Sequence, residues 1–211
     1  MKKSLNREGG VLVTFEGIDG SGKSTQIRLL TEWLRDRKIP FHLFREPGGT
    51  ELSEQIRELL LHSSGPMDPV TELLLFSAAR SQLVAERLIP LLKRGDLIIL
   101  DRFFDSTIAY QGYGRESASP DEIHRLNHLV SHRLRPDLTI YLRISPALAR
   151  SRRAEEADDR MEREEDSFFE RVALGFERLA EQSDRIVSLN GERPVEEIHR
   201  DVVRLMRSLT D

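Results

Sequence analysis

The 211-residue chain contains no cysteine, which excludes disulfide bonds and thiolate metal sites. This absence is typical of a reducing compartment, and we expect a cytoplasmic protein. Long apolar runs are also missing. The first run, residues 11–15, is too short for the core of a signal peptide, and no segment is long enough to span a bilayer. The net charge of −4 argues against nucleic acid or an anionic membrane as the main partner. With no internal repeat or low-complexity linker, the sequence predicts one domain.

A phosphate-binding loop is indicated near the N-terminus, where VLVTFEGIDGSGKST over residues 11–25 matches G-x-x-x-x-G-K-[ST]. Glycines let backbone N–H groups point at phosphate oxygens, and the helix that starts near Gly22 adds its positive end. The Lys23 ammonium can reach the β and γ oxygens, and the Ser24 hydroxyl can ligate Mg²⁺. A dinucleotide-binding fingerprint is excluded, because Thr25 stands where it requires Gly or Ala. The predicted triphosphate-binding residues are Gly17, Asp19, Gly20, Ser21, Gly22, Lys23, Ser24 and Thr25.

Short apolar segments alternate with helical patterns along the chain. The expected strands are residues 11–15, 41–44, 97–100, 138–142 and 186–189. The expected helices are residues 24–38, 51–61, 70–93 (interrupted or ended near Pro90), 106–112, 120–134, 145–160, 167–182 and 194–209. This alternation predicts an α/β fold with a parallel sheet of about five strands, flanked by helices. Ligands bind at the carboxyl ends of such strands, and Gly17, Arg45, Asp101 and Asn190 follow strands.

A carboxylate, Asp101, directly follows the apolar strand at residues 97–100. In a phosphate-loop enzyme this position holds Mg²⁺ directly or through water, whereas an isolated aspartate at such a place is often a helix N-cap. The adjacent Arg102 would be unusual in a switch or motor ATPase. It is well placed if a second anionic substrate is held against the first.

Five segments occur in a fixed order along the chain: FEGIDGSGKST, FREPGGT, LLLFSAAR, LDRFFDSTIAYQGYGR and ADDRMEREEDSFF. Together they resemble the bacterial thymidylate kinases (dTMP kinases), from about Val11 to the last strand. The resemblance implies the three-layer P-loop NTPase fold and transfer of a phosphoryl group from ATP to dTMP, giving dTDP. It also implies Mg²⁺ as the cofactor and a homodimer.

The resemblance also implies roles for individual residues. Phe76 would stack on the thymine ring. Arg80, four residues later on the same helix face, would bind the edge of that base. Alternatively, Phe76 could equally belong to a core stripe with Leu73 and Val84. Asp19 would accept the 3′-hydroxyl, and Tyr110 would disfavour a 2′-hydroxyl. The implied dTMP-binding residues are Asp19, Arg45, Phe76, Arg80, Arg102, Thr107, Tyr110 and Gln111. For Arg57 we favour an exposed position on a helix over a place in this site.

The charged segment at about residues 148–162 resembles the mobile lid of this family, and a solvated helix face is the alternative. Some members carry an arginine in the phosphate loop at the place of Gly20, and this chain does not. We therefore expect the lid to supply positive charge, from Arg153 or Arg150 and from Arg160. The expected catalytic residues are Lys23, Asp101, Arg102, Arg153 and Arg160, with Ser24 and Asp101 as metal ligands.

Two other functions fit parts of the sequence. A deoxynucleoside kinase would use a glutamate as base, and Glu46-Pro47 resembles its motif. However, Arg45, Arg80 and Arg102 provide more positive charge than a neutral nucleoside needs. A GTP-driven switch or assembly ATPase is less consistent still, because the sequence has no Asn-Lys-x-Asp guanine motif.

Overall fold

The computed structural model describes residues 9–63, 65–152, 161 and 164–210. Its strands form one sheet with the order β2-β3-β1-β4-β5, and every neighbouring pair is parallel. The strands are β1 (Val11–Glu16), β2 (His42–Arg45), β3 (Leu97–Asp101), β4 (Leu138–Arg143) and β5 (Ile186–Asn190). Each predicted strand is found, with its ends shifted by one residue at most. The predicted five-stranded parallel α/β fold is therefore confirmed.

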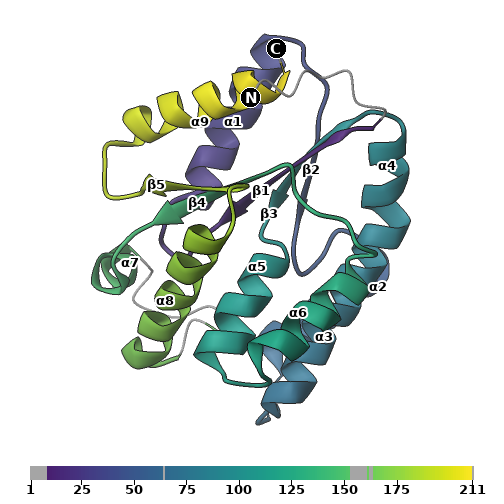
Figure 1. Cartoon of the computed structure of the whole chain (residues 1–211), viewed down its shortest axis with the longest axis vertical. Coiled ribbons are helices and arrows are strands. Elements are labelled where there is room, and N and C mark those ends of the chain that lie inside the picture. The colour runs from purple at the N-terminus through teal and green to yellow at the C-terminus, as the bar shows by residue number, and fades with distance from the viewer. Residues whose placement is uncertain (1–8, 64, 153–160, 162–163, 211) are drawn as a thin grey trace.

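Helices connect all the strands of the sheet (Figure 1). They are α1 (Lys23–Asp36), α2 (Glu51–His62), α3 (Pro69–Leu83), η1 (Val84–Leu88), α4 (Ile89–Lys93), α5 (Phe104–Thr107), η2 (Ile108–Gly114), α6 (Pro120–Val130), α7 (Pro146–Arg152), α8 (Asp166–Gln182) and α9 (Val195–Thr210). The elements η1 and η2 are π-helical. No helix within the described residues is long and apolar enough to cross a membrane.

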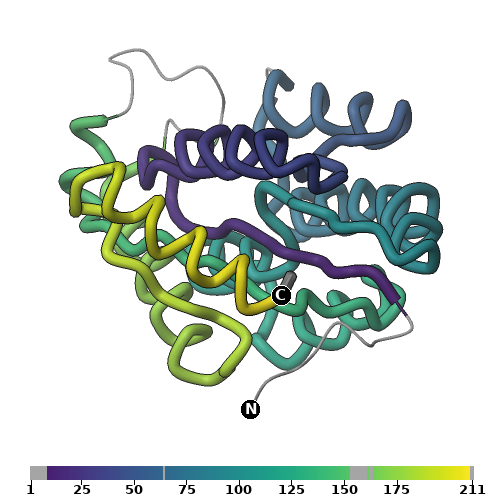
Figure 2. Tube along the Cα trace, turned by 90° about the horizontal axis from the view of Figure 1, so that it is seen from above, coloured from purple at the N-terminus to yellow at the C-terminus, as the bar shows by residue number. Residues whose placement is uncertain are grey.

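The three central strands β3, β1 and β4 are buried between two layers of helices, as the wholly apolar run in β3 predicts. Side chains alternate along β1, so Val13 and Phe15 pack against α1 and α9, while Leu12 packs on the opposite face with Leu83 of α3. Figure 1 shows α1 and α9 on one side of the sheet and α5 and α8 on the other. Figure 2, seen from the side of α1 and α9, shows β1 running between these two helices.

The strand order places the predicted site residues together. Strand β1 lies between β3 and β4, so the connections that leave β1 and β3 lead to opposite halves of the sheet. The carboxyl end of β1 is therefore the switch point at which ligands bind in such folds. In the register of the sheet, Asp101 at the end of β3 is opposite Phe15 on one side and Arg45 on the other. The loop after β1, Arg45 and Asp101 therefore share one edge.

Several predicted helices differ from the observed ones by more than one residue, and the helix expected over residues 24–38 ends at Asp36. The helix expected over residues 70–93 is continuous but contains η1, which ends two residues before Pro90, a residue with no N–H to donate to the preceding turn. Residues 106–112 lie in α5 and η2, where the Arg115 N–H donates to the Tyr110 carbonyl five residues earlier. Helix α6 ends at Val130 rather than residue 134, because His132 and Arg133 adopt left-handed backbone angles. Of the helix expected over 145–160, residues 153–160 lie outside the described part.

Candidate active site

The loop after β1 has the backbone that its glycines predict. Gly17, Gly20 and Gly22 all have positive φ angles, and a Cβ on Gly20 would lie 2.5 Å from the carbonyl oxygen of Ala149. A side chain there would clash with backbone, so only glycine fits. Gly22 is the N-cap of α1, and the helix starts at Lys23. The N-terminal N–H groups of α1 consequently face the same space as the loop, which is the geometry of an anion site.

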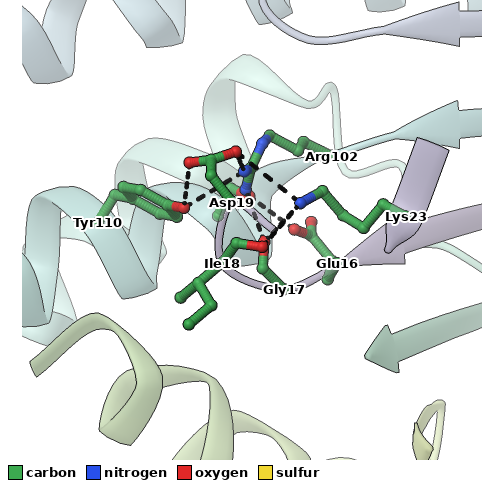
Figure 3. Close-up of polar contacts among 8 residues, drawn as sticks. Glu16, Gly17, Ile18, Asp19, Lys23, Arg102 and Tyr110 are labelled. Atoms are coloured by element: carbon green, nitrogen blue, oxygen red, sulfur yellow. Dashed lines mark hydrogen bonds and ion pairs between the residues drawn. The ribbon is translucent and has the colours of Figure 1, made fainter. Parts of the chain in front are cut away.

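Lys23 folds back over this loop. Its Nζ donates to the carbonyl oxygens of Gly17 at 2.9 Å and Ile18 at 3.1 Å, and it lies 4.0 Å from a carboxylate oxygen of Asp19 (Figure 3). Burial lowers the pKa of the Lys23 ammonium to about 8, and the neighbouring charge of Arg102 acts in the same direction. A phosphate bound beside this ammonium would add negative charge and raise its pKa.

Arg102 connects the loop to the helices below the sheet. Its backbone is left-handed, with a φ of 67°, which is unfavourable for a residue with a Cβ and turns the side chain back toward the loop. The guanidinium donates to the Gly17 carbonyl at 3.0 Å, to Ser106 Oγ at 3.2 Å and to the Tyr110 hydroxyl at 3.2 Å. It also forms a 2.5 Å ion pair with Asp19 (Figure 3). Arg102 is therefore a fixed cation between the loop and η2.

Asp19 remains ionised despite its surroundings. Burial alone would raise its pKa, but the charges of Arg102 and Lys23, with hydrogen bonds from Tyr110 and Arg102, hold the pKa well below the usual range. The Tyr110 hydroxyl donates to Asp19 at 2.9 Å, and burial raises the pKa of this phenol far above its ordinary value. Tyr110 thus serves as a neutral hydrogen-bond donor with its ring facing the site.

Glu16 at the end of β1 supports this cluster, although the sequence analysis did not select it. Its carboxyl accepts hydrogen bonds from the Phe103 N–H at 2.7 Å and from Ser106 Oγ at 2.6 Å. Burial and the nearby Asp105 raise the pKa of Glu16 to about 8. The contact satisfies a free N–H at the start of α5, where Phe103 provides no side-chain cap. Glu16 therefore fixes the helix that follows Arg102.

Arg80 lies in a second polar cluster and is almost fully buried. Its Nε and Nη2 lie 2.7 Å from Glu46 Oε2, and Nη1 donates to Thr107 Oγ1 at 2.7 Å and to Asn127 Oδ1 at 3.1 Å. The side chains of Arg80 and Glu46 are only 2% and 4% exposed. This pair joins α3 to the residue after β2, and neither Glu46 nor Asn127 was expected here as a partner of Arg80.

Two cavities meet at these clusters. The first lies between α2, α3 and η2 and is lined by Asp19, Glu46, Pro47, Arg57, Leu61, Phe76, Arg80, Arg102, Phe103, Ser106, Thr107, Tyr110, Gln111 and Met161. The second follows the loop and is lined by residues 19–26 together with Arg45, Glu46, Arg57, Asp101, Arg102, Arg152, Gly191, Arg193, Val195 and Ile198. The two linings share Asp19, Glu46, Arg57 and Arg102. The cavities are therefore adjacent, and two guanidinium groups and two carboxyl groups lie where they join.

The positions of Phe76 and Arg57 decide between alternatives that the sequence left open. Phe76 is half-buried in the wall of the first cavity and packs beside Leu60, whereas Leu73 and Val84 belong to other core clusters, so the expected common stripe is absent. Arg57 is half-buried and lines both cavities, and its Nη1 donates to the Pro47 carbonyl at 3.0 Å. The exposed position that we favoured for Arg57 is wrong, because its face of α2 turns toward the site.

The expected metal ligands lie in the second cavity. The Asp101 carboxylate has one buried oxygen, Oδ1, with no hydrogen-bond partner in the described part of the chain. Ser24 is exposed in the same cavity. No group of three acidic, His or Cys side chains suited to a metal occurs among the described residues. Magnesium characteristically binds one or two carboxylates and completes its shell with water and substrate phosphates, so this sparse donor set fits Mg²⁺.

Of three further arginines, Arg45 and Arg152 line the second cavity, whereas Arg150 lines neither cavity. Arg45 forms an exposed pair with Glu54 at 2.9 Å, Arg150 pairs with Asp166, and Arg152 donates to the Gly191 carbonyl at 3.1 Å. Arg152 lines the second cavity but was not among the predicted residues. Of the lid arginines expected to be catalytic, Arg153 and Arg160 lie outside the described residues.

Comparisons with known proteins agree with this geometry. Residues 15–202 match the model of the family described as thymidylate kinase. A thymidylate kinase from Chlorobaculum parvum is 42% identical over 94% of this chain and 96% of its own length, and one from Kosmotoga olearia is 44% identical over 92% and 94%. The crystal structure of thymidylate kinase from Ehrlichia chaffeensis has a TM-score of 0.76 at 35% identity, covering 94% of this chain and 99% of that chain. The chain belongs to the thymidylate kinase family.

Proposed function

We propose that this protein is a dTMP kinase, which transfers the γ-phosphate of ATP to dTMP and releases dTDP and ADP. The observation that carries this proposal is the meeting of two cavities at Asp19, Glu46, Arg57 and Arg102. One cavity contains a phosphate-binding loop, and the other contains an aromatic ring and polar groups that suit a nucleobase. Membership of the thymidylate kinase family supports this assignment of donor and acceptor.

The donor ATP would bind along residues 17–25. Backbone N–H groups of the loop and the start of α1 would hold its phosphates, and Lys23 would leave the carbonyls of Gly17 and Ile18 to contact the β and γ oxygens. The acceptor phosphate is already an anionic nucleophile, so no strong base is required. The chemical task is to hold two repelling phosphates in line and to neutralise the charge that develops between them.

The acceptor dTMP would bind in the first cavity. We place its base between Phe76 and the polar groups of Arg80, Thr107 and Gln111, with the sugar against Tyr110. Asp19 would then accept a hydrogen bond from the 3′-hydroxyl. The acceptor phosphate would lie near Arg102, Arg45 and Arg57, whose guanidinium groups suit bidentate contact with phosphate oxygens.

Magnesium would be held by Asp101 and Ser24 in the second cavity, where Asp101 Oδ1 is otherwise without a partner among the described residues. When bound, the ion neutralises charge on the donor phosphates. The lid arginines Arg153 and Arg160 remain proposed sources of further positive charge. Their place at the phosphates is a prediction from the sequence alone.

We further propose that this single-domain, cytoplasmic enzyme is a homodimer. Exposed leucines on α2, α3 and α6, which lie beside one another in Figure 1, support a second copy as the partner. Leu59 of α2, Leu74 of α3 and Leu129 of α6 are 56%, 53% and 73% exposed. Sedimentation velocity should give a dimer, and Leu74→Glu should shift it toward monomer. Leu174→Glu on α8, at a position 46% exposed, is the matched control and should not. A monomeric wild type would contradict the proposal.

The function is tested by a coupled assay of ADP release with dTMP, thymidine, dUMP and dCMP as acceptors. We expect dTMP to give the highest kcat/KM. Transfer to thymidine should be negligible, because its neutral 5′-hydroxyl offers no anion for the guanidinium groups that are proposed to hold the acceptor phosphate. Efficient use of thymidine, with Glu46 essential and Arg102 dispensable, would instead establish a deoxynucleoside kinase.

A further inference from the structure

A buried carboxylate behind the first cavity holds the amide of Gln111. Gln111 Nε2 lies 2.9 Å from Glu72 Oε1, and the Nε of Arg115 donates to the same oxygen at 3.1 Å. Glu72 and Gln111 are only 1% and 2% exposed, and Gln111 lines the first cavity. Glu72 lies on α3 and does not line that cavity. It is therefore placed to act on a ligand only through its neighbours.

This contact determines which way the Gln111 amide faces. An arginine Nε–H can only donate, so Glu72 Oε1 must be an acceptor where Arg115 meets it. The Gln111 atom that faces this acceptor must then be the NH₂ group. Its carbonyl oxygen, Oε1, has no hydrogen-bond partner within the described part of the chain and is left for the cavity. Without Glu72, either end of the amide could turn toward a ligand.

Arg80 provides the complementary donor in the same cavity. Of its five N–H groups, two face Glu46 and two face Thr107 and Asn127, which leaves one Nη2 hydrogen without a partner among the described residues. The cavity thus presents one donor and one acceptor from the side chains of Arg80 and Gln111. Buried contacts fix both groups: Glu46, Thr107 and Asn127 hold Arg80, and Glu72 holds Gln111 from behind the cavity wall.

We propose that Glu72 is a positioning residue that sets the base specificity of the acceptor site by fixing the orientation of Gln111. The inference rests on the proposed function. Thymine and uracil offer an acceptor at O4 and a donor at N3–H, which match an Arg80 donor and a Gln111 acceptor. Cytosine offers the reverse, a donor at N4 and an acceptor at N3, so its edge would meet like groups. Glu72 would therefore exclude cytosine without touching it.

The expected size of the effect follows from base discrimination elsewhere. A well-placed pair of hydrogen bonds to a base edge discriminates by roughly 1–3 kcal/mol, which is about 5- to 150-fold at ~1.4 kcal/mol per decade. Glu72→Met keeps the side-chain length but removes the acceptor. The ratio of kcat/KM for dTMP to that for dCMP should fall by about this factor. Because the ratio compares two substrates of one preparation, partial unfolding of the variant does not change it.

Three controls separate positioning from general loosening of the pocket. The dTMP-to-dUMP ratio should stay within about twofold in Glu72→Met, because both bases share the O4 and N3–H edge. Glu72→Gln retains an oxygen acceptor and should restore most of the dTMP-to-dCMP ratio. In a Gln111→Met background, adding Glu72→Met should have no further effect, because the orientation that Glu72 sets is already lost.

The outcomes are distinct for each proposal. If wild type prefers dTMP and Glu72→Met leaves the dTMP-to-dCMP ratio unchanged, the role of Glu72 is refuted while the proposed function stands. Equal falls in the dTMP-to-dCMP and dTMP-to-dUMP ratios would also refute it, since they indicate a loosened pocket. If wild type uses dCMP better than dTMP, the proposed function fails and this inference fails with it.

Discussion

The buried pair between Arg80 and Glu46 should make Arg80 structural as well as functional, and the two contributions can be separated. Both side chains are at least 96% buried, so Arg80→Met leaves Glu46 as an uncompensated charge. Removing one partner of such a pair costs about 3–5 kcal/mol in the free energy of unfolding. For a protein of this size, ~2–4 °C per kcal/mol gives a fall in Tm of roughly 6–20 °C.

A second substitution isolates the role in binding. Replacing both partners of a buried ion pair with apolar residues is often neutral for stability, so Arg80→Met/Glu46→Leu should recover most of the lost free energy. It should not recover the KM for dTMP, because the donor to the base is still absent. Urea unfolding followed by circular dichroism gives the stability, and the coupled assay gives the KM for dTMP and for ATP.

Arg178→Met is the control for this experiment, because Arg178 forms an exposed pair with Glu181 whose side chains are 56% and 65% exposed. Its loss should cost less than about 1 kcal/mol and leave both KM values unchanged. The reasoning is refuted if Arg80→Met is as stable as wild type. It is also refuted if the double variant regains the wild-type KM for dTMP, which would make Arg80 purely structural.

Four further predictions concern the donor site, the acceptor phosphate and the sugar. Lys23→Ala should lower kcat by at least ~10²-fold with an unchanged far-ultraviolet spectrum, and activity within tenfold of wild type would exclude the role of Lys23. Because the pKa of Lys23 is about 8 in the free protein, ATP affinity measured by calorimetry should fall as pH rises from 7 to 9, whereas Lys23→Met should show a flat profile. Arg102→Ala should lower kcat/KM for dTMP by roughly 30- to 5,000-fold with little change in ATP affinity; an equal loss for ATP would place Arg102 on the donor side. Tyr110→Ala should reduce selectivity against the ribonucleotide form of dTMP, and an unchanged selectivity would place the sugar contact elsewhere.

The parts of this protein that could be predicted from sequence are those set by local pattern. Each short apolar segment became a strand, and the wholly apolar run at residues 97–100 lies in the interior of the sheet, where both faces are covered. The conformation of the loop from Gly17 to Lys23 could be predicted from its glycines. Their φ angles are positive, and at Gly17 and Gly20 a Cβ would lie too close to backbone atoms. The gathering of Arg45 and Asp101 at one edge followed from the parallel order alone.

What could not be predicted depends on pairing across the fold. Glu46 and Arg80 are 34 residues apart, and Glu72 and Gln111 are 39 apart, so no helical or strand period links them. Arg57 could not be placed for a similar reason. The helical periodicity of α2 gives the face on which Arg57 lies, but it does not say whether that face meets solvent or a cavity. An acidic residue within an apolar stretch of a helix is one sequence feature that could have indicated such a buried pair. Glu72 is surrounded by apolar neighbours in TELLLF, and a carboxylate in such a place needs a partner.

The strength of the ion pair that each arginine of the site forms within the protein indicates how that arginine can bind a ligand. Arg45 shares an exposed pair with Glu54, which is worth at most about 1 kcal/mol, so a phosphate can displace Glu54 at little cost. Arg80 shares a buried pair with Glu46 that costs several kcal/mol to break, so it keeps this partner and offers a ligand only its remaining N–H. Arg102 lies between these cases, with a side chain 17% exposed. We therefore expect the arginine with the weakest internal pair to move toward the phosphate, while the buried one holds still and discriminates among bases.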